Sequence, residues 1–231
     1  MRLYNLLFIG LIVSAVSCAD TKYLASKMKS SEIRELEFFK PISSIAYVER
    51  ENLATIDDDL SSQSGKLISQ QVFNYSSQIP RLNPVIITDA NIQADLEAEV
   101  ITACRASSAY NSIEVIPIPP TIDALLEARG KRFALLTYYS GYKRSPESYA
   151  WSKRRAAANN LLNFMPVTSS PMFITIENSY SSRAVLYAMI VDAQTNKIVF
   201  FNEFITKGED PVSSEVISNE LNKIFLDYFR R

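Results

Sequence analysis

The chain has 231 residues, with 24 Lys and Arg against 25 Asp and Glu, no His, two Cys and five Gly. The lack of histidine excludes a Ser-His-Asp triad, a Cys-His dyad and an imidazole metal ligand. The formal net charge of −1 disfavours nucleic acid as a partner, because domains that bind nucleic acid usually carry a basic surface. A hydrophobic fraction of 47% is sufficient for a buried core, and we expect one folded domain.

The amino terminus has the pattern of a secretion signal. Arg2 precedes an uncharged apolar run, residues 6–13, which is shorter than the roughly 20 residues of a permanent transmembrane helix. Small residues then lead to a cysteine, and the segment Ser14-Ala15-Val16-Ser17-Cys18 resembles the lipobox of bacterial lipoproteins. Ala15 stands where that motif expects Leu. The resemblance implies that the signal is cleaved before Cys18 and that the Cys18 thiol carries a diacylglyceride.

The lipobox resemblance also sets the expected organisation of the chain. Residues 1–17 would be the signal peptide, residues 18–41 the lipidated cysteine and a tether, and residues 42–231 a single α/β domain. Several acyl chains hold a protein stably on a membrane. Asp20 lies beyond the position of an inner-membrane retention signal, so we expect an outer-membrane lipoprotein on the periplasmic or the surface side. The alternative is an ordinary secretory signal in which Cys18 has no role.

The rest of the chain alternates between strand and helix patterns. Short β-rich or apolar runs bounded by Pro, Asn, Asp or Gly predict strands at 42–49, 84–88, 113–118, 133–139, 182–192 and 197–205. Apolar residues at helical spacing predict helices at about 60–75, 90–107, 121–128, 146–164 and 211–228. Thr121 is the expected cap of the third helix. The run 133–139 is apolar on both faces, which indicates a central strand.

This order of elements predicts an α/β (α+β) fold. We expect a single domain of two or three layers, with a mixed sheet, interleaved helices, and a C-terminal β-hairpin followed by a closing helix. Asn196 is expected to take a left-handed conformation in the hairpin turn. Cys104 shares a helix face with Leu96 and Val100, so we interpret it as a buried structural thiol. If Cys18 is acylated, no intramolecular disulfide remains possible.

The hairpin sequence adds a family resemblance. Residues 184–199 run from an apolar strand through Asp192 and a turn with Thr195 and Asn196 into a second apolar strand. This pattern resembles the superfamily of the curli secretion channel lipoprotein, the TolB amino-terminal domain and the lipoprotein activators of peptidoglycan synthases. The resemblance implies a non-enzymatic module that binds other envelope proteins or assembles with copies of itself.

The sequence predicts no cofactor and no metal. Asp57, Asp58 and Asp59 are consecutive, whereas a calcium loop needs alternating oxygen ligands around a turn with Gly, so we assign them to a helix start. Residues 64–66 have the Ser-Gly-Lys order of a phosphate-binding loop. However, Leu60 replaces the first Gly of that motif and Leu67 its metal-binding hydroxyl.

One segment concentrates aromatic and basic side chains: Tyr138, Tyr139, Tyr142, Lys143, Arg144, Tyr149, Trp151, Lys153, Arg154 and Arg155. Tyr, Trp and Arg are enriched at binding hot spots. The candidate partner-binding residues are Tyr142, Lys143, Arg144, Tyr149, Trp151, Lys153, Arg154 and Arg155, facing an acidic or carbohydrate-bearing envelope partner or lipid phosphates. The alternative is that Tyr138 and Trp151 belong to the core and that the cations form a solvated helix face.

Three functions remain open from the sequence. The first is a lipid-anchored, non-enzymatic binding, assembly or accessory factor in the cell envelope. The second is a hydrolase of cell-wall polymers that uses two carboxylates, which needs no histidine. Its candidate acids are scattered, at Glu114, Glu127, Glu147, Glu177 and Glu203. The third is a periplasmic ligand carrier with an enclosed apolar pocket.

Overall fold

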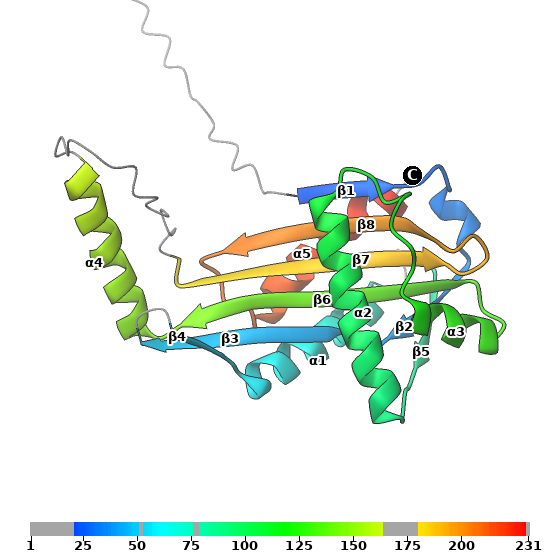
Figure 1. The fold of residues 1–231 in the computed structure, drawn as a ribbon, viewed down its shortest axis with the longest axis horizontal. Helices are drawn as coiled ribbons and strands as arrows, with labels where there is room; N and C mark the ends of the chain where they lie inside the picture. The colour runs from blue at the N-terminus through cyan, green and yellow to red at the C-terminus, as the bar shows by residue number, and fades with distance from the viewer. Residues whose placement is uncertain (1–20, 51–52, 76–78, 164–179, 230–231) are drawn as a thin grey trace, which may run out of the picture.

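The computed structural model describes residues 21–50, 53–75, 79–163 and 180–229 (Figure 1). The strands are β1 (Thr21–Ala25), β2 (Glu35–Phe39), β3 (Ile42–Arg50), β4 (Leu53–Ile56), β5 (Arg81–Val85), β6 (Phe133–Arg144), β7 (Ser182–Asp192) and β8 (Lys197–Lys207). The helices are α1 (Asp58–Asn74), α2 (Ala90–Ala109), α3 (Pro120–Ala128), α4 (Pro146–Asn163) and α5 (Ser214–Phe229), with a short 3-10 helix η1 (Ser30–Glu32).

The eight strands form one mixed sheet. β6, β7 and β8 are long and antiparallel, and β1 pairs with the outer side of β8. The other side of β6 is shared by two parallel strands in line, β2 along its first part and β3 along the rest. β5 then pairs with β2, and β4 pairs with β3, so both lie at the same margin of the sheet. The predicted α/β fold with a mixed sheet is confirmed, and the sheet is not closed into a barrel.

Helices cover both faces of the sheet (Figure 1). One core, under α1 and α5, is built on Leu135 and Phe200; the other, under α2 and α3, is built on Leu136 and Phe201. Neighbouring residues of a strand point to opposite faces, which is why consecutive residues of β6 and β8 enter different cores. The central strands are therefore apolar on both sides, as the sequence predicted. The arrangement has three layers.

The predicted tether over residues 18–41 was wrong where the structure describes it. Thr21–Ala25 is the edge strand β1, and Glu35–Phe39 is β2, a strand between β5 and β6. Tyr23 packs edge-to-face on Phe200 with ring centroids 5.9 Å apart, and Leu36 and Phe38 are buried. The strand β1 was not predicted because it contributes side chains to both cores, so its apolar residues do not alternate with polar ones.

Three smaller predictions also differ from the structure. Residues 113–118 form no strand; Ile113, Ile116 and Ile118 are buried against the α2 and α3 core as irregular chain. β5 begins at Arg81 and ends at Val85, before the predicted 88. Thr121 is not a cap but lies inside α3, where its amide and hydroxyl donate to Glu99 of α2 at 2.8 and 3.0 Å.

The C-terminal hairpin and the buried thiol are confirmed. Asp192 ends β7 and accepts two hydrogen bonds from Arg132, both at 2.8 Å, and one from the Thr195 hydroxyl at 3.0 Å. These bonds hold the pKa of Asp192 below its usual value against the opposing effect of burial. Asn196 has φ 51°, the left-handed conformation of a hairpin turn. Cys104 is fully buried, and burial raises the pKa of its thiol, as expected of a packing residue.

Candidate functional site

The predicted aromatic and basic segment divides between a strand end and a helix. Tyr138 and Tyr139 are buried core residues of β6, one in each core. β6 continues to Arg144 because its register with β7 and β3 continues, so Tyr142, Lys143 and Arg144 belong to this strand. The remaining candidates lie on α4, which contacts β3 and β6 and stands at one end of the sheet (Figure 1).

On α4 the candidate residues are ordered by helical spacing. Lys153 places its ammonium 4.5 Å from the Tyr149 ring centroid, and Arg155 places its guanidinium 5.1 Å from the Trp151 ring. Each is an i, i+4 pair, whose two members lie on the same side of a helix, and the two pairs are offset by two residues and so lie on different sides of α4. Such cation–π contacts contribute about 0.5–1 kcal/mol at exposed sites and hold the long basic side chains in place. Trp151 is half-buried beneath its cation and belongs to neither core, so the alternative that placed it in the core is not supported.

The cations of α4 and those of β6 differ in their partners. Lys143 forms an ion pair with Asp210 at 2.7 Å, and Arg144 lies 5.1 Å over the Tyr142 ring and donates to Ser148. In contrast, Lys153, Arg154 and Arg155 are all exposed, and none forms an ion pair with a carboxylate of the described residues. We call Tyr149, Trp151, Lys153, Arg154 and Arg155 the basic helix surface. This surface carries positive charge that the described part of the chain leaves uncompensated.

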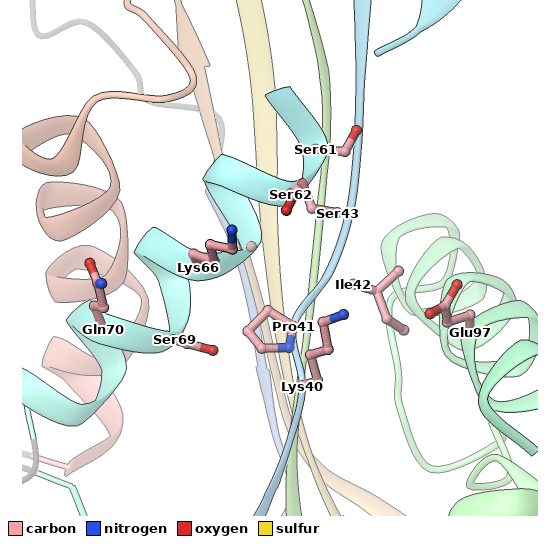
Figure 2. A pocket seen from close by; sticks show the side chains of 11 residues that line it. Lys40, Pro41, Ile42, Ser43, Ser61, Ser62, Lys66, Ser69, Gln70 and Glu97 are labelled. Atoms are coloured by element: carbon pink, nitrogen blue, oxygen red, sulfur yellow. The ribbon is translucent and has the colours of Figure 1, made fainter. Parts of the chain in front are cut away.

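A second feature, which the sequence did not predict, is a groove of about 450 Å³ between α1 and α2 (Figure 2). Its floor is the margin of the sheet where β2 passes into β3. The groove is lined by Lys40, Pro41, Ile42, Ser43, Ser61, Ser62, Gly65, Lys66, Ser69, Gln70 and Glu97. A Ser43 Oγ to Ser64 Oγ hydrogen bond of 2.6 Å holds α1 against this margin. Hydroxyl groups and two lysines dominate the polar lining.

The four candidate acids of the hydrolase hypothesis that the structure describes do not form a pair. Glu114, Glu127 and Glu147 are exposed in separate parts of the fold, Glu203 is buried on β8, and Glu177 lies outside the described residues. Glu35 and Glu37 lie on the same face of β2. Lys131 pairs with Glu35 at 2.8 Å, and Arg129 pairs with Glu37 at 2.9 Å. The hydrogen bond from Lys131 lowers the pKa of Glu35, which is unlike a catalytic acid that must hold its proton at neutral pH.

Glu220 is the one described carboxyl whose pKa is raised to about 7. It lies on α5 against β8, where burial disfavours its charged form and Glu209 adds repulsion, while a hydrogen bond from Thr206 opposes both. The nearby Tyr139 hydroxyl also favours the charged form of Glu220 and so lowers its pKa, although no well-formed hydrogen bond joins it to Oε2. Glu220 is 1% exposed, so we interpret it as a buried structural acid.

The ligand-carrier hypothesis predicted an enclosed apolar pocket. An apolar hollow of about 360 Å³ lies between α2 and residues 116–120 and is open to the surface. Within the described ranges, no three side chains of His, Cys, Asp or Glu come together as a metal site, and no helix is long and apolar enough to cross a bilayer. Cys18 lies outside the described residues.

The comparisons with known proteins give only weak structural similarities. No family model matches the sequence, and no curated protein matches it. Among solved structures, the PelC dodecamer from Paraburkholderia phytofirmans is similar over 92% of this chain and 99% of its own, with a TM-score of 0.40 and 7% sequence identity. A DUF4136 family protein from Bacteroides thetaiotaomicron is similar over 90% of this chain and 95% of its own, with a TM-score of 0.31 and 6% identity.

Proposed function

We propose that this chain is an envelope lipoprotein, anchored in the outer membrane through Cys18, that works by binding rather than by catalysis. The basic helix surface would contact an acidic surface of an envelope protein, either a different protein or a second copy. The observation that carries this proposal is that Lys153, Arg154 and Arg155 occupy one exposed turn of α4 without ion-pair partners among the described residues. The role would be that of an assembly or accessory factor.

The residue types of this surface suit a binding role. Trp151 and Tyr149 provide large rigid areas that bury apolar surface at low entropic cost. The cations above these rings would orient an acidic partner. The cations are pre-ordered by the rings, so less side-chain entropy is lost when a partner binds. An acidic partner would be steered by the local positive charge even though the whole chain has a net charge of only −1.

Reversing the charge of the basic helix surface should abolish its interaction. We expect Lys153→Glu/Arg154→Glu/Arg155→Glu to lower the yield of crosslinked envelope partners at least tenfold, because three attractive contacts become repulsive. The measurement is chemical crosslinking in cells followed by quantitative mass spectrometry of the purified protein.

The matched control reverses three exposed cations elsewhere, in Lys27→Glu/Lys29→Glu/Arg34→Glu. It changes the net charge by the same amount and should leave the partner yield unchanged. Equal partner yields from wild type and from the α4 variant, with both proteins folded, would end the proposal.

The anchor is a separate expectation with its own measurement. Cells labelled with palmitate should incorporate label into the wild-type protein and none into Cys18→Ala, because the acyl chains depend on that thiol. Cys104→Ala is the control, since the Cys104 side chain is fully buried and should have no part in acylation. Label that persists in Cys18→Ala would contradict the lipoprotein assignment.

A further inference from the structure

The sheet has a short unpaired margin inside the groove between α1 and α2. β5 pairs with β2 as far as Phe39, and β4 pairs with β3 only from Ala46. Among the described residues, no strand lies on the outer side of residues 40–45. In Figure 2 this margin faces the viewer, with α1 on one side and α2 on the other. At about 3.3 Å per residue, the gap is roughly 20 Å long.

The backbone at this margin points alternate peptide groups away from β6. The Ile45 amide donates to Ser61 Oγ, and the Ile45 carbonyl accepts from the Asp57 amide, both at 2.9 Å on the side away from β6. Peptide groups of a strand alternate in direction, so the Ser43 amide and carbonyl face the same side as those of Ile45. The Pro41 carbonyl, just before β3, lies against Gly65 of α1. The margin therefore offers one donor and one acceptor, both on Ser43.

The groove walls add charge and hydroxyl groups around these backbone groups. Lys66 extends from α1, and Lys40 lies at the start of the unpaired margin; both are exposed (Figure 2). Glu97 on α2 is the only acidic residue of the lining, and its carboxylate already accepts from Gln93 at 2.7 Å. The groove therefore presents the exposed ammonium groups of Lys40 and Lys66, whereas the carboxylate of Glu97 already accepts a hydrogen bond. Its charge complements an acidic ligand.

We propose that this groove binds an extended acidic peptide segment of a partner protein, which adds to the sheet as a short strand between β5 and β4. In strand addition the main-chain hydrogen bonds provide affinity, and the side chains around the strand provide specificity. Here the amide and the carbonyl of Ser43 would pair with the peptide backbone. Lys40 and Lys66 would contact its carboxylates, and the groove hydroxyls its remaining polar groups.

The same features explain why the margin does not pair indiscriminately. Open strand edges cause aggregation, and natural proteins protect them with proline, lysine and short length. Lys40-Pro41 supplies two of these protections, and α1 and α2 flank the margin on either side. This site is distinct from the basic helix surface and does not depend on it.

The proposal is tested with a phage-displayed library of random peptides selected on the purified protein. The selected peptides should be enriched in Asp and Glu. Ser43→Pro removes the outward amide and leaves the β3 to β6 ladder intact, since proline is tolerated where a strand faces outward. We expect this substitution to lower the binding affinity of the selected peptides about tenfold, because one backbone hydrogen bond is lost and the proline ring fits poorly. Fluorescence anisotropy measures the affinity.

Ser43→Ala is the matched control, because it loses the same hydroxyl contact with Ser64 but keeps the amide; it should bind as wild type does. Lys40→Glu/Lys66→Glu should also weaken binding roughly tenfold, against no change for Lys27→Glu/Lys29→Glu. This second pair keeps the test valid should Ser43→Pro fail to fold. The proposal is overturned if no peptide is selected, if the selected peptides are not acidic, or if folded Ser43→Pro binds as tightly as Ser43→Ala.

Discussion

The free energy of unfolding is expected to fall by about 3 kcal/mol between pH 4.5 and pH 7 through Glu220 alone, and Glu220→Gln is expected to abolish this loss. Burial raises the pKa of Glu220 from 4.5 to about 7. One pKa unit corresponds to about 1.4 kcal/mol, which gives the expected size. The amide of glutamine keeps the shape of the side chain and stays neutral at every pH.

The sign of the effect follows from which state holds the proton. Between pH 4.5 and 7 the folded protein keeps Glu220 protonated, whereas the unfolded chain releases that proton. The folded state therefore binds more protons, and its stability decreases as the pH rises. The contribution is fully present below pH 4.5 and is lost as the pH rises through about 7.

Urea denaturation at a series of pH values measures this contribution as the difference between the wild type and the variant. Glu220→Gln should unfold at higher urea than the wild type at pH 8, and at a similar concentration near pH 4.5. Glu215→Gln is the control, since Glu215 is exposed on the same helix and should leave the wild-type pH dependence in place. If the free energy of unfolding of the wild type changed with pH in the same way as that of Glu220→Gln, Glu220 would ionise normally in the fold.

Phe200→Ala is expected to lower the free energy of unfolding by about 4 kcal/mol, the largest effect of a single core change. Phe200 has no exposed surface, and its ring lies 4.5 Å from that of Tyr228, 5.9 Å from that of Tyr23 and 6.2 Å from that of Phe225. Removing it leaves a cavity that joins β8, β1 and α5, and the surrounding rings also lose their favourable contacts with it.

The matched control is Phe73→Ala, in which the same atoms are removed from a phenylalanine that is 40% exposed on α1. We expect a loss of no more than about 1 kcal/mol there, because little cavity forms at the surface. Thermal and urea unfolding measure both variants. Similar losses for the two variants would mean that β1 and α5 do not close over Phe200 as described.

The sequence predicted most elements whose apolar residues follow a clear period. The long strands β7 and β8 and the helix α5 were identified because each keeps one pattern over its length and is bounded by Asp, Asn or Pro. β1 was missed because a five-residue edge strand with apolar side chains on both faces shows neither helical nor strand alternation. Residues 113–118 were wrongly predicted as a strand because they form a short β-rich run next to prolines. Their isoleucines are buried by packing on α2 and not by a sheet.

The two candidate surfaces differ in how far the sequence could show them. The basic helix surface was visible because its residues lie within seven consecutive positions of one helix, with the Tyr149–Lys153 and Trp151–Arg155 pairs on different sides of α4. The groove was not, because Lys40 and Lys66 come from different elements. Its open margin also depends on where β4 and β5 stop pairing, which is set by tertiary structure. Clusters of charge are readable in a sequence, whereas an unpaired strand edge is a property of the assembled sheet.

Photo-crosslinking in living cells tests most directly whether the basic helix surface is the contact surface. In one variant a photoreactive amino acid replaces Arg154 on α4. In a second variant it replaces Lys29, which is exposed just before η1. We predict that the probe at position 154 yields a defined adduct with an envelope protein or a second copy. This adduct should disappear when Lys153 and Arg155 are changed to Glu, and the probe at position 29 should not give it. No adduct from position 154, or the same adducts from both positions, would contradict the proposed role of α4.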